Sequence, residues 1–138
     1  MNQILTAKLT GIPASAQALA LARLMEGSVP PLPAPASILY IATSDRALES
    51  LQSALAFFAP DAEVISFPAW DCMPYDRSSP QPALMAARMQ ALAGLLNKLD
   101  SRLRGNDNKV IILTTASAIL QKLPPREIIK RAVFSIKR

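Results

Sequence analysis

The chain has 138 residues, of which 51% are hydrophobic and 18% are charged, and this size and composition are those of one folded domain. It contains a single cysteine, Cys72, and no histidine. Disulfides within the chain, Cys-only and common His-containing zinc sites, and Ser-His-Asp or Cys-His nucleophiles are therefore excluded. No apolar run reaches the roughly 18 residues of a membrane helix, so we expect a cytoplasmic protein without membrane contacts.

The net charge of +5 is unevenly distributed along the chain. Residues 1–96 carry five basic and seven acidic side chains, whereas residues 97–138 carry ten basic and three acidic ones. The basic C-terminal third is either a solvated rim or a nucleic-acid-binding surface. The scarcity of aromatic residues among these charges favours the rim, because single-strand binders stack bases on aromatic side chains.

The chain begins with a predicted helix and a stiff connector. Residues 15–26 are strong helix formers, with Ser15 as the expected N-cap and Gly27 as the residue that ends the helix. Four prolines within residues 30–35 then predict an extended connector and no regular element.

Three apolar segments alternate with helical segments through the rest of the chain. Residues 38–42, 63–67 and 109–113 are short and apolar, and the first and third have the pattern of strands buried on both faces. Residues 46–58, with Ser44 as a candidate cap, and residues 82–96 repeat apolar side chains at helical spacing. This alternation predicts an α/β domain with three layers and a parallel sheet.

The C-terminal segments predict two short helices and a last strand. Thr115 is expected to cap a helix over residues 116–122, and Pro125 to open another through Arg131. Residues 133–136 have the pattern of a further strand that has no partner after it, so we expect residues 1–138 to be one truncated domain of a larger protein.

Residues 97–108 do not fit this alternation. They are polar, basic and turn-rich, and they separate the third helix from the strand that it should feed. They resemble the peptides that mobile palindromic repeats encode in bacterial genes, and we expect an exposed insertion. The alternative is a basic arm that uses Arg102, Arg104 and Lys109 to contact phosphates.

A loop resembling a phosphate-binding loop precedes the first helix. Such a loop follows the pattern G-x-x-x-x-G-K-[ST], in which the lysine contacts the β- and γ-phosphates and the hydroxyl holds Mg²⁺. Gly11 matches the first glycine, whereas Ala16, Gln17 and Ala18 stand at the positions of the second glycine, the lysine and the hydroxyl residue. Taken alone, this near-match is either a vestigial phosphate loop or an ordinary loop that starts a helix. Both readings predict no cofactor and no metal for this chain.

Residues 67–80, FPAWDCMPYDRSSP, are unusual, and residues 109–125 read KVIILTTASAILQKLPP. These segments resemble the N-terminal region of bacterial transcription-repair coupling factors. The family pattern is W-(D/E)-x-x-P-Y-(D/E)-x-x-S-P, then a helix carrying an arginine, then a strand followed by a T-x-x-(A/S)-L-x-Q-(K/R) helix. The matching residues are Trp70, Asp71, Pro74, Tyr75, Asp76, Ser79, Pro80, Arg88, Val110, Thr115, Leu120, Gln121 and Lys122.

The resemblance covers nearly the whole chain except residues 97–108, and it implies a fold. The corresponding family region is similar to the first domain of the excinuclease helicase that verifies damage, which keeps a working phosphate loop, whereas the coupling factor has a degenerate one. A RecA-like α/β domain is therefore implied, and residues 11–18 are interpreted as a vestigial loop. The excinuclease helicase also has a DNA-clamping hairpin where this chain has only a short segment, so damage clamping is not expected.

The resemblance also implies a much longer parent protein, whose partners are the excinuclease, RNA polymerase and DNA. That parent uses ATP and Mg²⁺ in a motor module to displace stalled RNA polymerase from damaged DNA, and it recruits the excinuclease through a second N-terminal domain. We assign none of these activities to the 138 residues themselves.

Four residues form a possible binding surface: Trp70, Tyr75, Arg77 and Arg88. The aromatic side chains either stack on a base or pack down to fix an irregular loop, and nearby prolines favour the second role. The arginines either hold phosphate or pair with Asp71 and Asp76. Those aspartates are expected to cap backbone N–H groups and not to bind metal.

The sequence therefore predicts a non-catalytic scaffold or interaction domain of a transcription-repair coupling factor, with neighbouring domains of the parent as its partners. One alternative is a nucleotide-binding NTPase domain related to the phosphate-loop enzymes. The loss of charge at Gln17 and of a metal ligand at Ala18 argues against it. The other alternative is a basic nucleic-acid-binding module, which predicts binding that weakens steeply with salt.

Overall fold

The computed structural model describes residues 7–30, 32–35, 37–72, 77–102 and 109–132. Its elements, in chain order, are η1 (Ala14–Ala16), α1 (Gln17–Glu26), β1 (Ser37–Ala42), α2 (Asp45–Phe58), β2 (Glu63–Phe67), α3 (Pro82–Arg102), β3 (Val110–Thr115), α4 (Ala116–Ile119) and α5 (Arg126–Ala132). No helix in this described part of the chain is both long and apolar enough to cross a bilayer.

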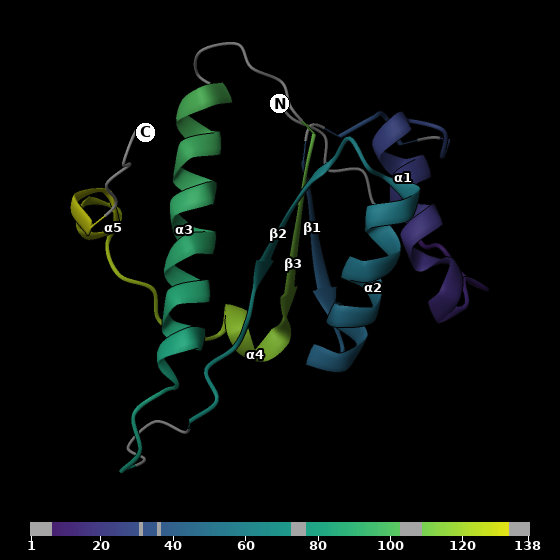
Figure 1. The fold of residues 1–138 in the computed structure, drawn as a ribbon. Coiled ribbons are helices and arrows are strands. Elements are labelled where there is room, and N and C mark those ends of the chain that lie inside the picture. The colour runs from purple at the N-terminus through teal and green to yellow at the C-terminus, as the bar shows by residue number, and fades with distance from the viewer. Residues whose placement is uncertain (1–6, 31, 36, 73–76, 103–108, 133–138) are drawn as a thin grey trace.

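The three strands form one parallel sheet in the order β1-β3-β2. Ile111 of β3 lies in register with Ile38 of β1 on one side and with Val64 of β2 on the other. Helices α1 and α2 lie on one face of the sheet and α3 lies on the other (Figure 1). The predicted three-layer α/β architecture with a parallel sheet is therefore confirmed.

The larger of two hydrophobic clusters lies between the sheet and the pair α1 and α2. Leu55 of α2 and Ile111 and Leu113 of β3 are 0% exposed within it. The apolar residues of α2 point to this cluster because they recur every three or four positions, at Leu48, Leu51 and Leu55. Burial of this kind stabilises a fold by about 25 cal/mol for each Å² of apolar surface removed from water.

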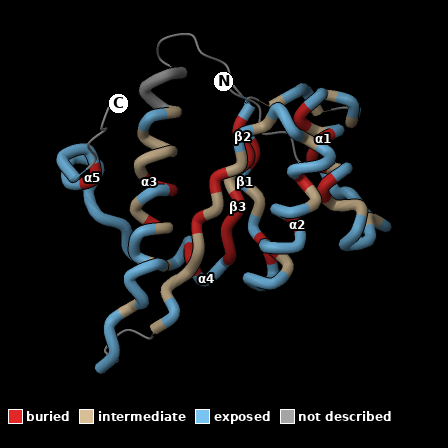
Figure 2. The backbone as a smooth tube through the Cα atoms, viewed as in Figure 1, coloured by how far each residue is buried: buried red, intermediate tan, exposed pale blue. Residues whose placement is uncertain are grey.

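The second cluster lies under α3 on the opposite face. It joins Ile65 and Phe67 of β2, Ala91 and Leu92 of α3, and Ile129 of α5. Figure 2 shows buried backbone along β2 and β3, whereas most of α5 is exposed. Helix α3 contacts β2 much more than β1, so this face of the sheet is covered on one side only.

The prediction that residues 38–42 form a strand buried on both faces is half wrong. Ile38 and Ala42 are buried against the helices, but Leu39 is 57% and Ile41 is 52% exposed. Their side chains lie on the face of α3, which does not extend over β1. The same prediction is correct for β3, because the central strand has neighbours on both edges and helices on both faces.

The ends of α1 follow the sequence at one terminus only. Ser15 lies inside the turn η1, and Ala16 takes the N-cap position without any side-chain hydrogen bond, so the predicted cap is wrong. Gly27 ends the helix in the left-handed region at φ 77°, with Ser28 N–H donating to Arg23 O at 2.9 Å, as in a Schellman motif. A Cβ at Gly27 would stand 3.0 Å from the Cβ of Ala34.

Other boundaries also differ from expectation. Ser44 caps α2 as predicted, its Oγ accepting from Ala47 N–H at 3.2 Å. Helix α3 continues past residue 96 to Arg102, into the segment interpreted as an insertion, and α4 ends at Ile119, short of residue 122. The rest of that segment, residues 103–108, and the strand predicted over residues 133–136 lie outside the described residues.

The difference between β1 and β3 predicts two different costs for the same mutation. Ile111→Val removes a methylene from a fully buried position and should lower the free energy of unfolding by about 0.5–1.5 kcal/mol. Ile41→Val, at a position 52% exposed, should change it by less than about 0.5 kcal/mol. Urea denaturation of both variants measures the difference, and equal losses would contradict this account of the open face.

Candidate functional site

The loop that resembles a phosphate loop leads through η1 into α1. The start of α1 lies toward the same edge of the domain as the carboxyl ends of β1 and β3 (Figure 1). Gly11 has φ 76°, and a Cβ built there would contact nothing within 4 Å. Its left-handed backbone therefore serves the turn itself and not a close approach of another part of the described chain.

The residues at the positions of the lysine and the hydroxyl are committed to packing. Tyr40 of β1 donates its hydroxyl hydrogen to Gln17 Oε1 at 2.9 Å, which holds the amide against the sheet. Ala18 is 1% exposed and belongs to the larger hydrophobic cluster. Neither position offers a positive charge or a metal ligand to the solvent.

A cavity of about 290 Å³ lies beside this loop. Its described lining consists of aliphatic side chains, Gly11, and the polar groups of Gln17 and Tyr40, with no charged residue. A triphosphate is held by a lysine, by Mg²⁺ and by several backbone N–H groups. The loop retains the helix N-terminus of that arrangement but not the cation or the metal ligand.

The second candidate site is built around Arg88, which is only 3% exposed on α3. Its guanidinium carbon lies 4.2 Å from the ring centroid of Phe67 and 4.3 Å from that of Trp70. Arg88 is therefore placed between the last residue of β2 and the tryptophan of the loop that follows. A cation over an aromatic face is attracted by the ring quadrupole, and more strongly where water is excluded.

Gln121, in the segment after α4, joins the three parts of this site. Its Oε1 accepts from Trp70 N–H at 3.0 Å and from Arg88 Nη1 at 3.0 Å. Arg88 Nη1 also donates to the carbonyl oxygen of Pro68. We call these residues, Phe67, Pro68, Trp70, Arg88 and Gln121, the arginine cluster. It ties the loop after β2 to α3 and to the segment after α4.

Burial lowers the pKa of Arg88, because desolvation disfavours the charged guanidinium. An arginine still keeps its proton in proteins, so its charge is balanced by ring faces and by carbonyl and amide oxygens. Pairing of Arg88 with Asp71 is not what the structure has: Asp71 Oδ2 accepts from Gln81 N–H at 3.4 Å. This backbone contact is the kind of role that the sequence predicted for Asp71.

The four residues expected to form a binding surface are thus not equivalent. Arg88 is buried and Trp70 is half-buried, both inside the arginine cluster, whereas Arg77 is exposed. Tyr75 and Asp76 lie outside the described residues. Their role in binding therefore stays a prediction.

Sequence reasoning missed Phe67 and Gln121 as members of the site. Gln121 was visible as a motif residue, but its hydrogen bonds join groups 51 and 33 positions away. Phe67 was recognised only as the end of a strand. Both roles depend on contacts between segments far apart in the sequence.

Replacing Arg88 tests whether the arginine cluster holds the loop. Arg88→Lys keeps a charge but loses the planar group that stacks between rings and donates in a fork. We expect a loss of about 1.5–3 kcal/mol in the free energy of unfolding, together with a red shift of the emission of Trp70, the only tryptophan. The matched control is Arg46→Lys on the exposed face of α2, which should change neither. Unchanged Trp70 emission in Arg88→Lys would show that the loop is held otherwise.

Comparison with known proteins finds relatives of one kind. Over 90 residues, 65% of this chain, it is 31% identical to the transcription-repair-coupling factor of Rickettsia bellii (strain RML369-C) and 30% identical to that of Rickettsia prowazekii (strain Madrid E). Over 76 residues, 55% of the chain, it is 32% identical to that of Haemophilus influenzae (strain ATCC 51907 / DSM 11121 / KW20 / Rd). The matched region is only 6–7% of these relatives. No family model and no solved structure matches the chain.

These matches agree with the resemblance that the W…PY…SP segment indicated, and they extend well beyond it. The chain is a relative of the transcription-repair-coupling factors, with an extent and motifs consistent with part of their N-terminal region.

Proposed function

We propose that this chain is a non-catalytic interaction domain of a transcription-repair-coupling factor, and that it serves transcription-coupled nucleotide excision repair by packing against neighbouring domains of a longer protein. The observation that carries the proposal is the commitment of phosphate-loop positions to the fold. Ala18 is 1% exposed and Gln17 is bonded to Tyr40 at 2.9 Å. A buried alanine presents no oxygen to Mg²⁺, and an amide carries no charge for a phosphate.

The surroundings of the loop support the same proposal. The cavity of about 290 Å³ is lined largely by aliphatic side chains such as Leu9, Leu21 and Leu24. Burying phosphate charge there would cost free energy without a compensating cation. The loop therefore has the shape of a nucleotide-binding element without its electrostatics, which favours a vestigial RecA-like origin.

The activities of the longer parent are proposed for that parent and not for these residues. They comprise ATP-driven translocation, displacement of RNA polymerase from DNA and recruitment of the excinuclease. The chain spans about 7% of the length of the Rickettsia relatives. An interaction domain without catalysis is what a segment of that size with an inactive loop contributes.

Nucleic-acid binding is a second candidate, favoured by the basic segment after β3. Lys122, Arg126, Lys130 and Arg131 are all exposed. Residues 109–132 contain no phenylalanine, tyrosine or tryptophan, however, and a base-stacking platform needs them. We therefore interpret these charges as a solvated rim.

A thermal melt of the purified chain with and without Mg-ATP tests the proposed role. We expect a cooperative transition whose midpoint does not move, because a ligand raises the midpoint only when it binds the folded state. Mg²⁺ without nucleotide and Mg-ADP are the controls that separate metal from nucleotide effects. An upward shift of several degrees with Mg-ATP alone would overturn the non-catalytic proposal in favour of a nucleotide-binding domain.

A further inference from the structure

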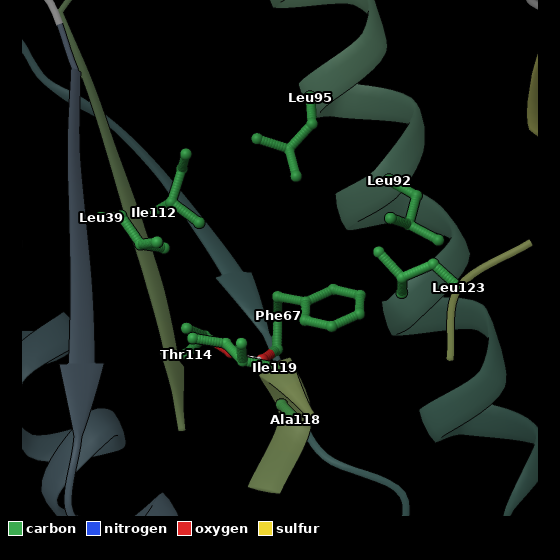
Figure 3. Close-up of a pocket in the computed structure, with 9 residues that line it drawn as sticks. All are labelled: Leu39, Phe67, Leu92, Leu95, Ile112, Thr114, Ala118, Ile119 and Leu123. Carbon is green, nitrogen blue, oxygen red and sulfur yellow. Dashed lines mark hydrogen bonds between the residues drawn. The ribbon is translucent and has the colours of Figure 1, made fainter. Parts of the chain in front are cut away.

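The uncovered part of the sheet forms a groove on the face of α3 (Figure 3). We call it the β1 groove. Leu39 of β1 and Ile112 of β3 form its floor, Leu92 and Leu95 of α3 form one wall, and Ile119 closes the end near α4. Phe67, Thr114, Ala118 and Leu123 complete the lining. No charged side chain of the described residues lines it.

The groove exposes aliphatic side chains that a folded domain ordinarily covers. Leu39 is 57%, Leu123 is 53% and Ile119 is 45% exposed, and Ile41 beside Leu39 on the same face of β1 is 52% exposed. Parallel sheets are normally covered on both faces, and apolar clusters of this kind mark interaction sites. The domain is therefore incomplete on this face when it stands alone.

The size of the groove argues for side chains and against a cofactor. Its cavity is about 210 Å³, below the roughly 300–1,000 Å³ of small-molecule sites. Its long wall is α3, which covers the β2 side of this face. The vacant position is the one that a second helix alongside α3 would take over β1, since helices are the usual cover of parallel strands.

Charge next to the groove indicates the flank of that helix. Lys122 directly precedes Leu123 and is exposed, and residues 109–132 carry five basic side chains and one acidic one. Acidic residues at the end of a docked helix near α4 would complement this charge. The relatives are long enough to supply such a helix, because the matched region is 7% of their length.

We propose that the β1 groove is the docking site of an amphipathic helix that carries a leucine and isoleucine stripe and acidic residues at the end next to α4. The helix-in-groove mode of recognition reads anchors at helical spacing, as this lining requires. The inference rests on the proposed interaction role, and it names the kind of partner that the role requires.

The test is fluorescence anisotropy of a labelled synthetic peptide of about 15 residues, a length at which isolated helices are marginal in water. The peptide carries a Leu/Ile stripe at helical spacing and glutamates at one end. We expect saturable binding to the full chain, weaker binding of the same peptide with lysines in place of the glutamates, and none with the stripe scrambled. Failure of the striped peptide to saturate would overturn the proposal.

Two matched variants locate the binding site. Leu39→Ser should weaken binding about tenfold, because an anchored leucine is worth about 1.4 kcal/mol or more. Leu120→Ser, at a residue 86% exposed that does not line the groove, should leave binding unchanged. Both substitutions lie on exposed positions and should preserve the melt. Equal effects of the two variants would overturn the assignment to this groove.

Two further outcomes would assign the groove to another occupant. Sedimentation as a dimer that Leu39→Ser converts to a monomer would give it to a second copy of the chain. Displacement of the peptide by a duplex DNA oligonucleotide would give it to nucleic acid. Loss of peptide binding with an unmoved Mg-ATP melt removes only this inference, whereas a moved melt removes the proposed function.

Discussion

The position of β3 between its two parallel neighbours is the constraint on which the rest of the structure depends. Ile111 and Leu113 on one face complete the cluster under α1 and α2, and Val110 on the other belongs to the cluster under α3. Thr114, 1% exposed, donates its hydroxyl hydrogen to Phe67 O at 3.0 Å. This bond fixes the end of β2, where the loop carrying Trp70 begins. Both candidate sites are therefore positioned from the central strand.

The two sites show polar groups serving the fold. Gln17 and Tyr40 satisfy each other beside the vestigial loop, and Gln121 satisfies the Trp70 N–H and Arg88 in the arginine cluster. A buried cation without such partners would be costly. Because these groups are already bonded within the chain, the structure supports a domain whose surface is used for contact and not for catalysis.

Much of this architecture was predictable from local sequence. The strand over residues 63–67, the cap at Ser44 and the stop at Gly27 follow from apolar runs, side-chain oxygens and a left-handed glycine. The exposure of Leu39 was not predictable, because an apolar strand has the same sequence pattern whether or not a helix covers it. The resemblance to transcription-repair coupling factors was also available from the W…PY…SP segment.

The details of the sites were less accessible to sequence reasoning. Arg88 is typical of an exposed helix residue by type, and only the aromatic residues and the oxygen acceptors brought in from other segments explain its burial. Pairing with an aspartate was the simpler expectation, since opposite charges attract without any knowledge of the fold. Helix α3 extends beyond its apolar repeat to Arg102, through residues whose polarity alone suggested a loop.

The most direct measurement is a titration of the isotope-labelled chain with Mg-ATP followed through backbone amide resonances. The account predicts that the amides of Gly11, Gln17 and Ala18 keep their positions, because the residues that would hold phosphate and metal are absent or buried. Saturable displacement of these amides, with the rest of the spectrum unmoved, would contradict it and identify the loop as a working nucleotide site.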